Sequence, residues 1–117
     1  MSSSPRADLL TDLDPGQAAD LLARGEAVLL DVREPDEWAA GHAPQAEHLP
    51  LAQVRLDRVP YAETVIIVCR SGRRSGQAAD LLATAGVSVH NLAGGMIAWA
   101  EADLPVVTEG GGRGEIA

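Results

Sequence analysis

An unbroken apolar stretch near the middle of the chain limits the fold more than any other feature. Residues 64–68 read Thr-Val-Ile-Ile-Val, β-branched throughout and without alternation between apolar and polar side chains. A strand of this kind is covered on both faces, which is typical of the centre of a parallel sheet. The rest of the chain must therefore supply helices for both faces of that sheet.

Helix and strand signals do alternate along the chain. Asp14 followed by Pro15 is an N-cap and first-turn pair, which predicts a helix that ends near Gly25. The other expected segments are strands at 28–32, 64–68 and 87–92, an extended stretch over 41–50, a loose helix around 51–56, and helices over 35–38, 75–85 and 96–102. This order predicts an α/β domain with a parallel sheet.

One octapeptide occurs twice in the chain. Residues 16–23 and 76–83 both read Gly-Gln-Ala-Ala-Asp-Leu-Leu-Ala. A duplication would make two equivalent halves, but the flanking sequences differ and the chain is too short for two domains. We favour the alternative, in which two helices each pack a small Ala/Leu face on the sheet.

The composition describes a small acidic protein. Its 117 residues are enough for one compact domain, which we expect at 8–108 between flexible tails at 1–7 and 109–117. The net charge is −8, so neither nucleic acid nor a membrane is an expected partner. No apolar run approaches the ~18 residues of a membrane span, and the start lacks the apolar part of a signal peptide, so a cytoplasmic location is expected.

Cys69, the only cysteine, directly follows the apolar stretch and precedes a polar loop and a helix. Loop residues 70–75 read Arg-Ser-Gly-Arg-Arg-Ser. Ligands bind at the carboxyl ends of parallel strands, and a tight loop entering a helix directs N–H groups towards an anion. Gly72 can adopt a positive φ there, and Gly76 would allow close backbone approach. The helix start and the three arginines favour a thiolate, so a nucleophile is a better interpretation of Cys69 than a core residue.

The spacing within this loop indicates which anion it receives. Cysteine phosphatases carry an arginine six places after the nucleophile, and Ser75 occupies that place here. The loop is one residue short of the phosphatase pattern, which fits the transfer of a single sulfur from an anionic donor such as thiosulfate. A phosphatase or an arsenate reductase is the weaker hypothesis.

Three ordered motifs resemble the rhodanese family. Residues 30–38, Leu-Asp-Val-Arg-Glu-Pro-Asp-Glu-Trp, with Gly-His-Ala-Pro at 41–44, resemble its first signature. Residues 68–75, Val-Cys-Arg-Ser-Gly-Arg-Arg-Ser, look like its active-site loop, and 94–99, Gly-Gly-Met-Ile-Ala-Trp, with Leu-Pro-Val at 104–106, are similar to its closing signature. The resemblance covers residues 14–107, and Gln45 stands where the family usually has Gly.

This resemblance implies an α/β fold with a five-stranded parallel sheet flanked by helices on both faces. It also implies a thiosulfate sulfurtransferase in which Cys69 becomes a persulfide, with thiosulfate as donor and cyanide, a thiol or a protein as acceptor. The substrate-binding positions are then Arg70, Ser71, Gly72, Arg73, Arg74 and Ser75. Asp31 and Arg33 map onto a pair that supports the loop through salt bridges. A persulfide carrier and a non-catalytic binding module of the same type remain the alternatives.

Asp31 and the histidines have further interpretations from the residues alone. Asp31 ends a strand at the same sheet edge as Cys69, so it could brace Arg74 or cap the helix that starts near Pro35. The three histidines His42, His48 and His90 lack the spacing of metal ligands, and neither a metal nor another cofactor is expected. His42 is a weak hypothesis as catalytic base, because a thiolate activated by arginines needs none.

Two other groups of side chains are assigned to structure rather than to chemistry. Trp38 and Trp99 are predicted to lie in the core. The acidic residues Glu34, Asp36 and Glu37 are predicted to form a solvated helix face.

Overall fold

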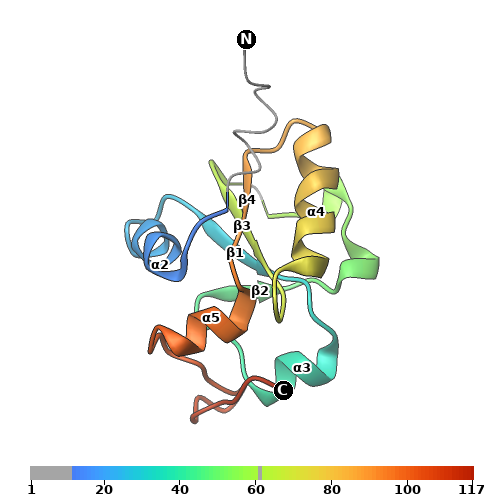
Figure 1. Ribbon diagram of the computed structural model, residues 1–117. Helices are drawn as coiled ribbons and strands as arrows, with labels where there is room; N and C mark the ends of the chain where they lie inside the picture. The colour runs from blue at the N-terminus through green and yellow to red at the C-terminus, as the bar shows by residue number, and fades with distance from the viewer. Residues whose placement is uncertain (1–11, 61) are drawn as a thin grey trace.

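A parallel sheet lies at the centre of the computed structural model, which describes residues 12–60 and 62–117 (Figure 1). Its strands are β1 (Val28–Asp31), β2 (Ala46–His48), β3 (Val65–Val68) and β4 (Val89–Asn91), in the order β2-β1-β3-β4. Every pairing is parallel, with Asp31 beside Val68 and Ile67 beside Asn91. The carboxyl ends of β1, β3 and β4 therefore meet at one edge, where Cys69 follows β3.

Among residues 12–60 and 62–117 the sheet has four strands, where the resemblance implied five. Leu13 reaches the place beside β4, but it forms only a single bridge to Leu92. The pairing does not continue past Leu13 because Asp14 caps α2 (Pro15–Ala23), and Pro15 has no N–H to continue the ladder. The predicted tail at 1–7 lies outside the described residues.

Two segments in the middle of the chain differ from the prediction. The stretch over 41–50, expected to be only extended, contains β2, which pairs with β1. The loose helix expected around 51–56 is two short 3₁₀ turns, η1 (Leu51–Gln53) and η2 (Leu56–Arg58). The remaining helices and strands lie within a few residues of their predicted places.

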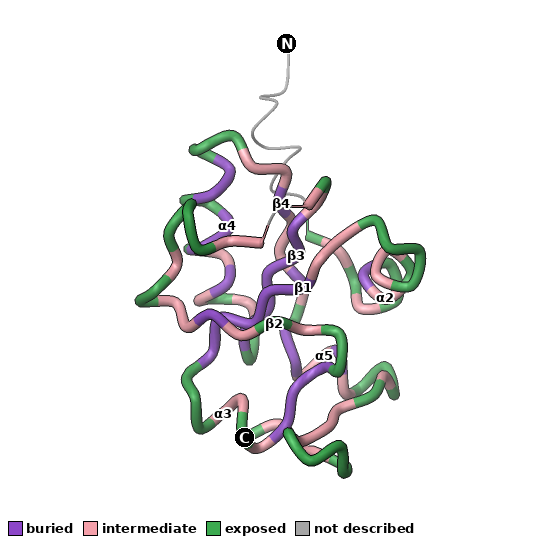
Figure 2. Tube along the Cα trace, turned by 180° about the vertical axis from the view of Figure 1, so that it is seen from behind, coloured by how far each residue is buried: buried purple, intermediate pink, exposed green. Residues whose placement is uncertain are grey.

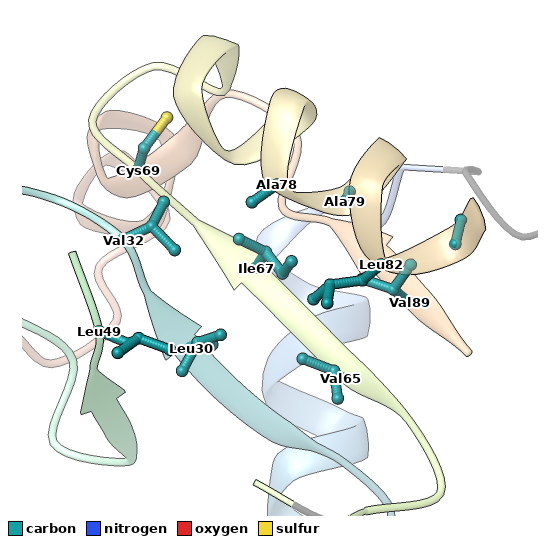
Figure 3. Packing of buried hydrophobic residues seen from close by; sticks show 11 residues of the cluster. Leu30, Val32, Leu49, Val65, Ile67, Cys69, Ala78, Ala79, Leu82 and Val89 are labelled. Atoms are coloured by element: carbon teal, nitrogen blue, oxygen red, sulfur yellow. The ribbon is translucent and has the colours of Figure 1, made fainter. Parts of the chain in front are cut away.

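Helices cover both faces of the sheet, as the apolar β3 stretch required. Val65 and Ile67 point to the face covered by α4 (Arg73–Thr84), where Leu82 packs on them (Figure 3). Ile66 and Val68 point to the opposite face, which is covered by α2 and α5 (Gly95–Glu101). Buried residues accordingly follow the central strands β1 and β3 (Figure 2).

The repeated octapeptide packs differently in its two copies. In α2 it buries only Ala18. In α4 the same letters bury Ala78, Ala79, Leu82 and Ala83. The two helices lie on opposite faces of the sheet, so the repeat is explained by two helices that each present a small apolar face.

Residues 109–117 run back along the fold beside α3 (Pro35–Ala40), where Figure 1 places the C-terminus. The Gly114 N–H donates to the Val106 carbonyl at 2.8 Å, and the Glu115 N–H donates to the Ala40 carbonyl at 2.9 Å. Ile116 packs against the core. The mobility expected of this segment stays a prediction, and these are the contacts that it would have to release.

Within the described ranges, no helix combines the length and the apolar character that crossing a bilayer requires. The longest one described, α4, has 12 residues and carries a polar face.

Candidate active site

Cys69 stands at the carboxyl end of β3, where the chain turns through residues 70–72 into α4, whose first residues 73–75 complete the loop predicted from the sequence. Its Sγ accepts hydrogen bonds from the Gly72 N–H at 3.1 Å and from the Ser75 hydroxyl at 3.3 Å. The residue is only 1% exposed. The loop therefore aims donors at the sulfur, which an ordinary core thiol would not have.

Opposing effects act on the ionisation of Cys69. Burial is the largest single effect and raises the pKa of the thiol. Hydrogen bonds from the Ser75 hydroxyl and from the N–H groups of Ser75, Gly72 and Ser71 lower it, and their sum exceeds the effect of burial, so the pKa lies below the ordinary value. Hydrogen bonds are the main cause of the lowering, whereas the sequence predicted an equal effect of the arginines. The site favours a thiolate, the reactive form of cysteine.

The first turn of α5 fixes the shape of the loop through two backbone hydrogen bonds. The Met96 N–H donates to the Cys69 carbonyl at 2.8 Å, and the Ile97 N–H donates to the Arg70 carbonyl at 3.1 Å. With the carbonyls turned towards α5, the N–H groups that follow are free to face the sulfur. The same contacts give hydrogen-bond partners to two N–H groups in the first turn of α5, which have no partner within the helix.

Two glycines make this arrangement possible. Gly72 has a φ of +107°, as predicted, and starts α4. Gly95 has a φ of +63°, and a Cβ there would stand 2.5 Å from the Cys69 carbonyl oxygen. Gly76, which the sequence assigned to close approach, has open space around it, so that assignment is wrong. Gly95 was missed because its neighbour, the loop, is distant in sequence.

Arg74 is tied to α3 by an acid that the sequence had placed on a solvated face. Its two terminal nitrogens donate to the Glu37 carboxylate at 2.7 and 2.8 Å. The hydrogen bond from Arg74 is the largest effect on Glu37 and lowers the pKa of that carboxyl from 4.5 to about 2, against the opposing effect of burial. Glu37 thus joins the second half of the loop to α3.

Asp31 and Arg33 form a fully buried pair, each 0% exposed. Arg33 Nη2 donates to Asp31 Oδ2 and to the Gly41 carbonyl, both at 2.8 Å, while its Nη1 has no partner in the described part of the chain. The brace from Asp31 to Arg74 and the cap by Asp31 of the helix near Pro35 are wrong, because the carboxylate binds Arg33 and Glu34 occupies the N-cap of α3. The loop support that the resemblance implied for Asp31 and Arg33 stays a prediction. The pair joins the end of β1 to the turn at Gly41.

The other polar side chains of the loop are exposed. Arg70 Nε donates to the Ala117 carbonyl at 2.8 Å, and Ser71 faces solvent. Arg73 borders a hollow of about 470 Å³ that is also lined by Asn91. Neither Arg70 nor Arg73 is paired with an Asp or Glu side chain among residues 12–60 and 62–117.

His42 and Trp38 belong to a separate stack beside α3. The two rings lie 3.5 Å apart and are nearly parallel, and His48 also stacks with Trp38, at 4.7 Å. His42 Nδ1 lies 2.8 Å from the Trp38 carbonyl, so this ring is not directed at the sulfur as a base would be. Trp38 is half-buried rather than in the core, whereas Trp99 is fully buried, as predicted.

A comparison with family models decides where this site belongs. The model of the rhodanese-like domain matches residues 14–102, which include β1, the loop after β3 and α5. This chain belongs to the rhodanese family. The rhodanese motifs found in the sequence are thus the segments that meet at the carboxyl edge of the sheet.

Individual relatives agree with the assignment to the rhodaneses. A sulfurtransferase of Allochromatium vinosum is 42% identical over 107 residues, which are 88% of this chain and 100% of that protein. The thiosulfate sulfurtransferase GlpE of Actinobacillus pleuropneumoniae is 32% identical over 105 residues, 87% of this chain and 97% of that one. The crystal structure of a rhodanese-related protein from Thermoplasma volcanium superposes with a TM-score of 0.77 at 25% identity, covering 85% of this chain and 99% of its own.

Gly95→Ala should disrupt the rhodanese loop, whereas Gly76→Ala should not. A Cβ at Gly95 collides with loop carbonyls and requires a strained φ, while Gly76 lies in α4 with open space around it. We expect Gly95→Ala to slow alkylation of Cys69 at neutral pH by at least about tenfold, because the displaced loop would lose at least one hydrogen bond that stabilises the thiolate. Gly76→Ala should keep the wild-type alkylation rate and add up to about 1 kcal/mol of stability. Equal alkylation rates in both variants would contradict the role given to α5.

Glu37→Gln should remove part of the acid sensitivity of the fold. The folded-state pKa of Glu37, about 2, lies below its ordinary value of 4.5. The pair with Arg74 therefore stabilises the protein fully above pH 4.5, and this contribution is lost as the pH falls towards 2. At neutral pH we expect Glu37→Gln to be less stable by roughly 1–3 kcal/mol, and this difference should shrink over that pH window.

Urea unfolding of both proteins at a series of pH values measures this difference. Asp36→Asn is the matched control, because Asp36 is an exposed neighbour in the same helix. A Glu37→Gln deficit that stays constant from neutral pH to pH 2 would show that the ion pair is not its cause.

Proposed function

We propose that this rhodanese is a sulfurtransferase that moves a sulfane sulfur from thiosulfate to an external acceptor through a persulfide on Cys69. The Cys69 thiolate attacks the outer sulfur of thiosulfate. The bond between that sulfur and the sulfonate breaks, and sulfite leaves with the electron pair. Cyanide or a thiolate then attacks the outer sulfur of the persulfide, which releases thiocyanate or a new persulfide and restores the Cys69 thiolate.

The convergence of hydrogen-bond donors on Cys69 Sγ is the observation that carries this proposal. The Gly72 N–H and the Ser75 hydroxyl contact the sulfur directly at 3.1 and 3.3 Å. The sulfur is negatively charged before the first attack and again after the second, when it is the leaving group. Donors fixed in advance stabilise that charge in both half-reactions.

The arginines of the loop divide into two roles. Arg74 has both terminal nitrogens committed to Glu37, so we assign it to holding the loop against α3. Arg70 and Arg73 are exposed and are not paired with a described Asp or Glu side chain, so we assign them to the oxygens of an anionic donor. Arg70 would then exchange its contact with the Ala117 oxygen for the donor. Arginine suits this task because its planar group binds tetrahedral oxyanions through paired hydrogen bonds.

The acceptor must come from outside the chain. Cys69 is the only cysteine, so no second thiol of this chain can take the sulfur from the persulfide. The free thiol must also stay reduced, and the cytoplasm is a reducing compartment, so we propose a cytoplasmic location. A carrier that delivers the persulfide to a partner protein would use the same site, and repeated turnover with small acceptors separates it from an enzyme.

Intact-mass measurement after incubation with thiosulfate tests the proposal. We expect a mass gain of one sulfur atom, which cyanide removes with formation of thiocyanate over many cycles. Cys69→Ser should show no gain and no thiocyanate, because the nucleophile is absent. Wild-type loading that discharges only once would support the carrier, and activity retained in Cys69→Ser would contradict the assignment of the nucleophile.

A further inference from the structure

The Ser75 hydroxyl lies between two acceptors and can serve only one of them at a time. Its Oγ is 3.3 Å from Cys69 Sγ and also within hydrogen-bond distance of Asn91 Oδ1. A serine hydroxyl has a single proton to donate, and neither a thiolate nor an amide oxygen can donate one in return. The two acceptors therefore compete for the same proton.

The orientation of the Asn91 amide is fixed by a second contact. Its Nδ2 lies 3.3 Å from the Gly72 carbonyl oxygen. A carbonyl only accepts hydrogen bonds, so the nitrogen of the amide must face Gly72 and the oxygen must face Ser75. Asn91 is the last residue of β4 and pairs with Ile67 of β3, so the sheet sets its place beside the loop.

We propose that Asn91 is a positioning residue that competes with Cys69 for the Ser75 proton and so limits how strongly the loop stabilises the thiolate. With a neutral Cys69, the hydroxyl donates to Asn91. With a thiolate, the hydroxyl turns to the sulfur, and the Asn91 and Ser75 oxygens face each other without a proton between them. Ser75 favours the thiolate, whereas Asn91 opposes it.

If the protein transfers sulfur as proposed above, this competition helps both half-reactions. When an acceptor attacks the persulfide, the bond between the two sulfurs breaks and its electron pair stays on Cys69 Sγ. The Ser75 hydroxyl donates to Asn91 Oδ1 while the inner sulfur is uncharged, and it can turn and donate to Sγ as the charge develops. A thiolate stabilised less strongly is also a better nucleophile towards the donor, because intrinsic reactivity falls as the thiol pKa falls.

Other charges around Cys69 come from several elements and stay unchanged in the test. Arg74 of α4 interacts electrostatically with Cys69 and is paired with Glu37 of α3. The Asp31–Arg33 pair lies at the carboxyl end of β1, the strand beside β3. Arg70 and Arg73 belong to the loop itself, and the first turn of α5 carries no acid.

The test compares Asn91→Leu, which has nearly the same shape, in the wild-type protein and in the Ser75→Ala background. The readout is the pH midpoint of Cys69 alkylation by iodoacetamide. Asn91→Leu alone should lower this midpoint by roughly half a pH unit to one unit, the size expected of one hydrogen bond. Ser75→Ala should raise it, and adding Asn91→Leu to Ser75→Ala should then leave it unchanged. Asn91→Ala should shift the midpoint in the same direction as Asn91→Leu, which covers the case in which leucine prevents folding.

The comparison between backgrounds separates the proposed competition from simple loosening of the loop. Both variants of Asn91 lose the contact to Gly72, and that loss acts with or without the Ser75 hydroxyl. A shift of equal size in both backgrounds, a rise of the midpoint in Asn91→Leu, or no shift at all would overturn the proposal. The measurement needs no sulfur donor, so its result is independent of whether the proposed sulfur transfer occurs.

Discussion

The environment of Cys69 depends on the contact between α5 and the two carbonyls at the start of the loop. The Met96 and Ile97 N–H groups hold the Cys69 and Arg70 carbonyls on the outside of the turn. Only with these carbonyls turned away can the N–H groups that follow point at the sulfur. The reactive state of the thiol is therefore a property of the packing between α5 and β3.

The central strand makes that packing possible. β3 is buried along its whole length, with α4 on one face and α2 and α5 on the other. Because α4 continues from the loop and α5 lies beneath it, the two helix starts approach Cys69 from opposite sides of the sheet. The N–H groups of α5 hold the loop carbonyls, whereas the Gly72 N–H and the Ser75 hydroxyl at the start of α4 face the sulfur. The thiolate is thus stabilised by uncharged donors, on a chain whose net charge is −8.

Local features of the site could be predicted from the sequence, and features that join distant segments could not. The apolar strand, the cysteine that follows it and the left-handed Gly72 are neighbours in the chain, so their roles follow from spacing. The ion pair between Arg74 and Glu37 joins residues 37 positions apart. The sequence of α3 does not distinguish Glu37, which faces Arg74, from the neighbouring exposed acids. The fifth strand that the resemblance implied is represented in the described residues by the bridge between Leu13 and Leu92, which the cap at Asp14 prevents from continuing past Leu13.

The central claim is that hydrogen bonds from the loop outweigh burial and hold the pKa of the Cys69 thiol below its ordinary value. The ultraviolet absorbance of the thiolate, recorded against pH for the wild type and corrected with Cys69→Ser, measures this ionisation directly. The account predicts a midpoint below the ordinary thiol value of about 8.5. A midpoint at or above that value would show that burial dominates and that the loop does not prepare a nucleophile.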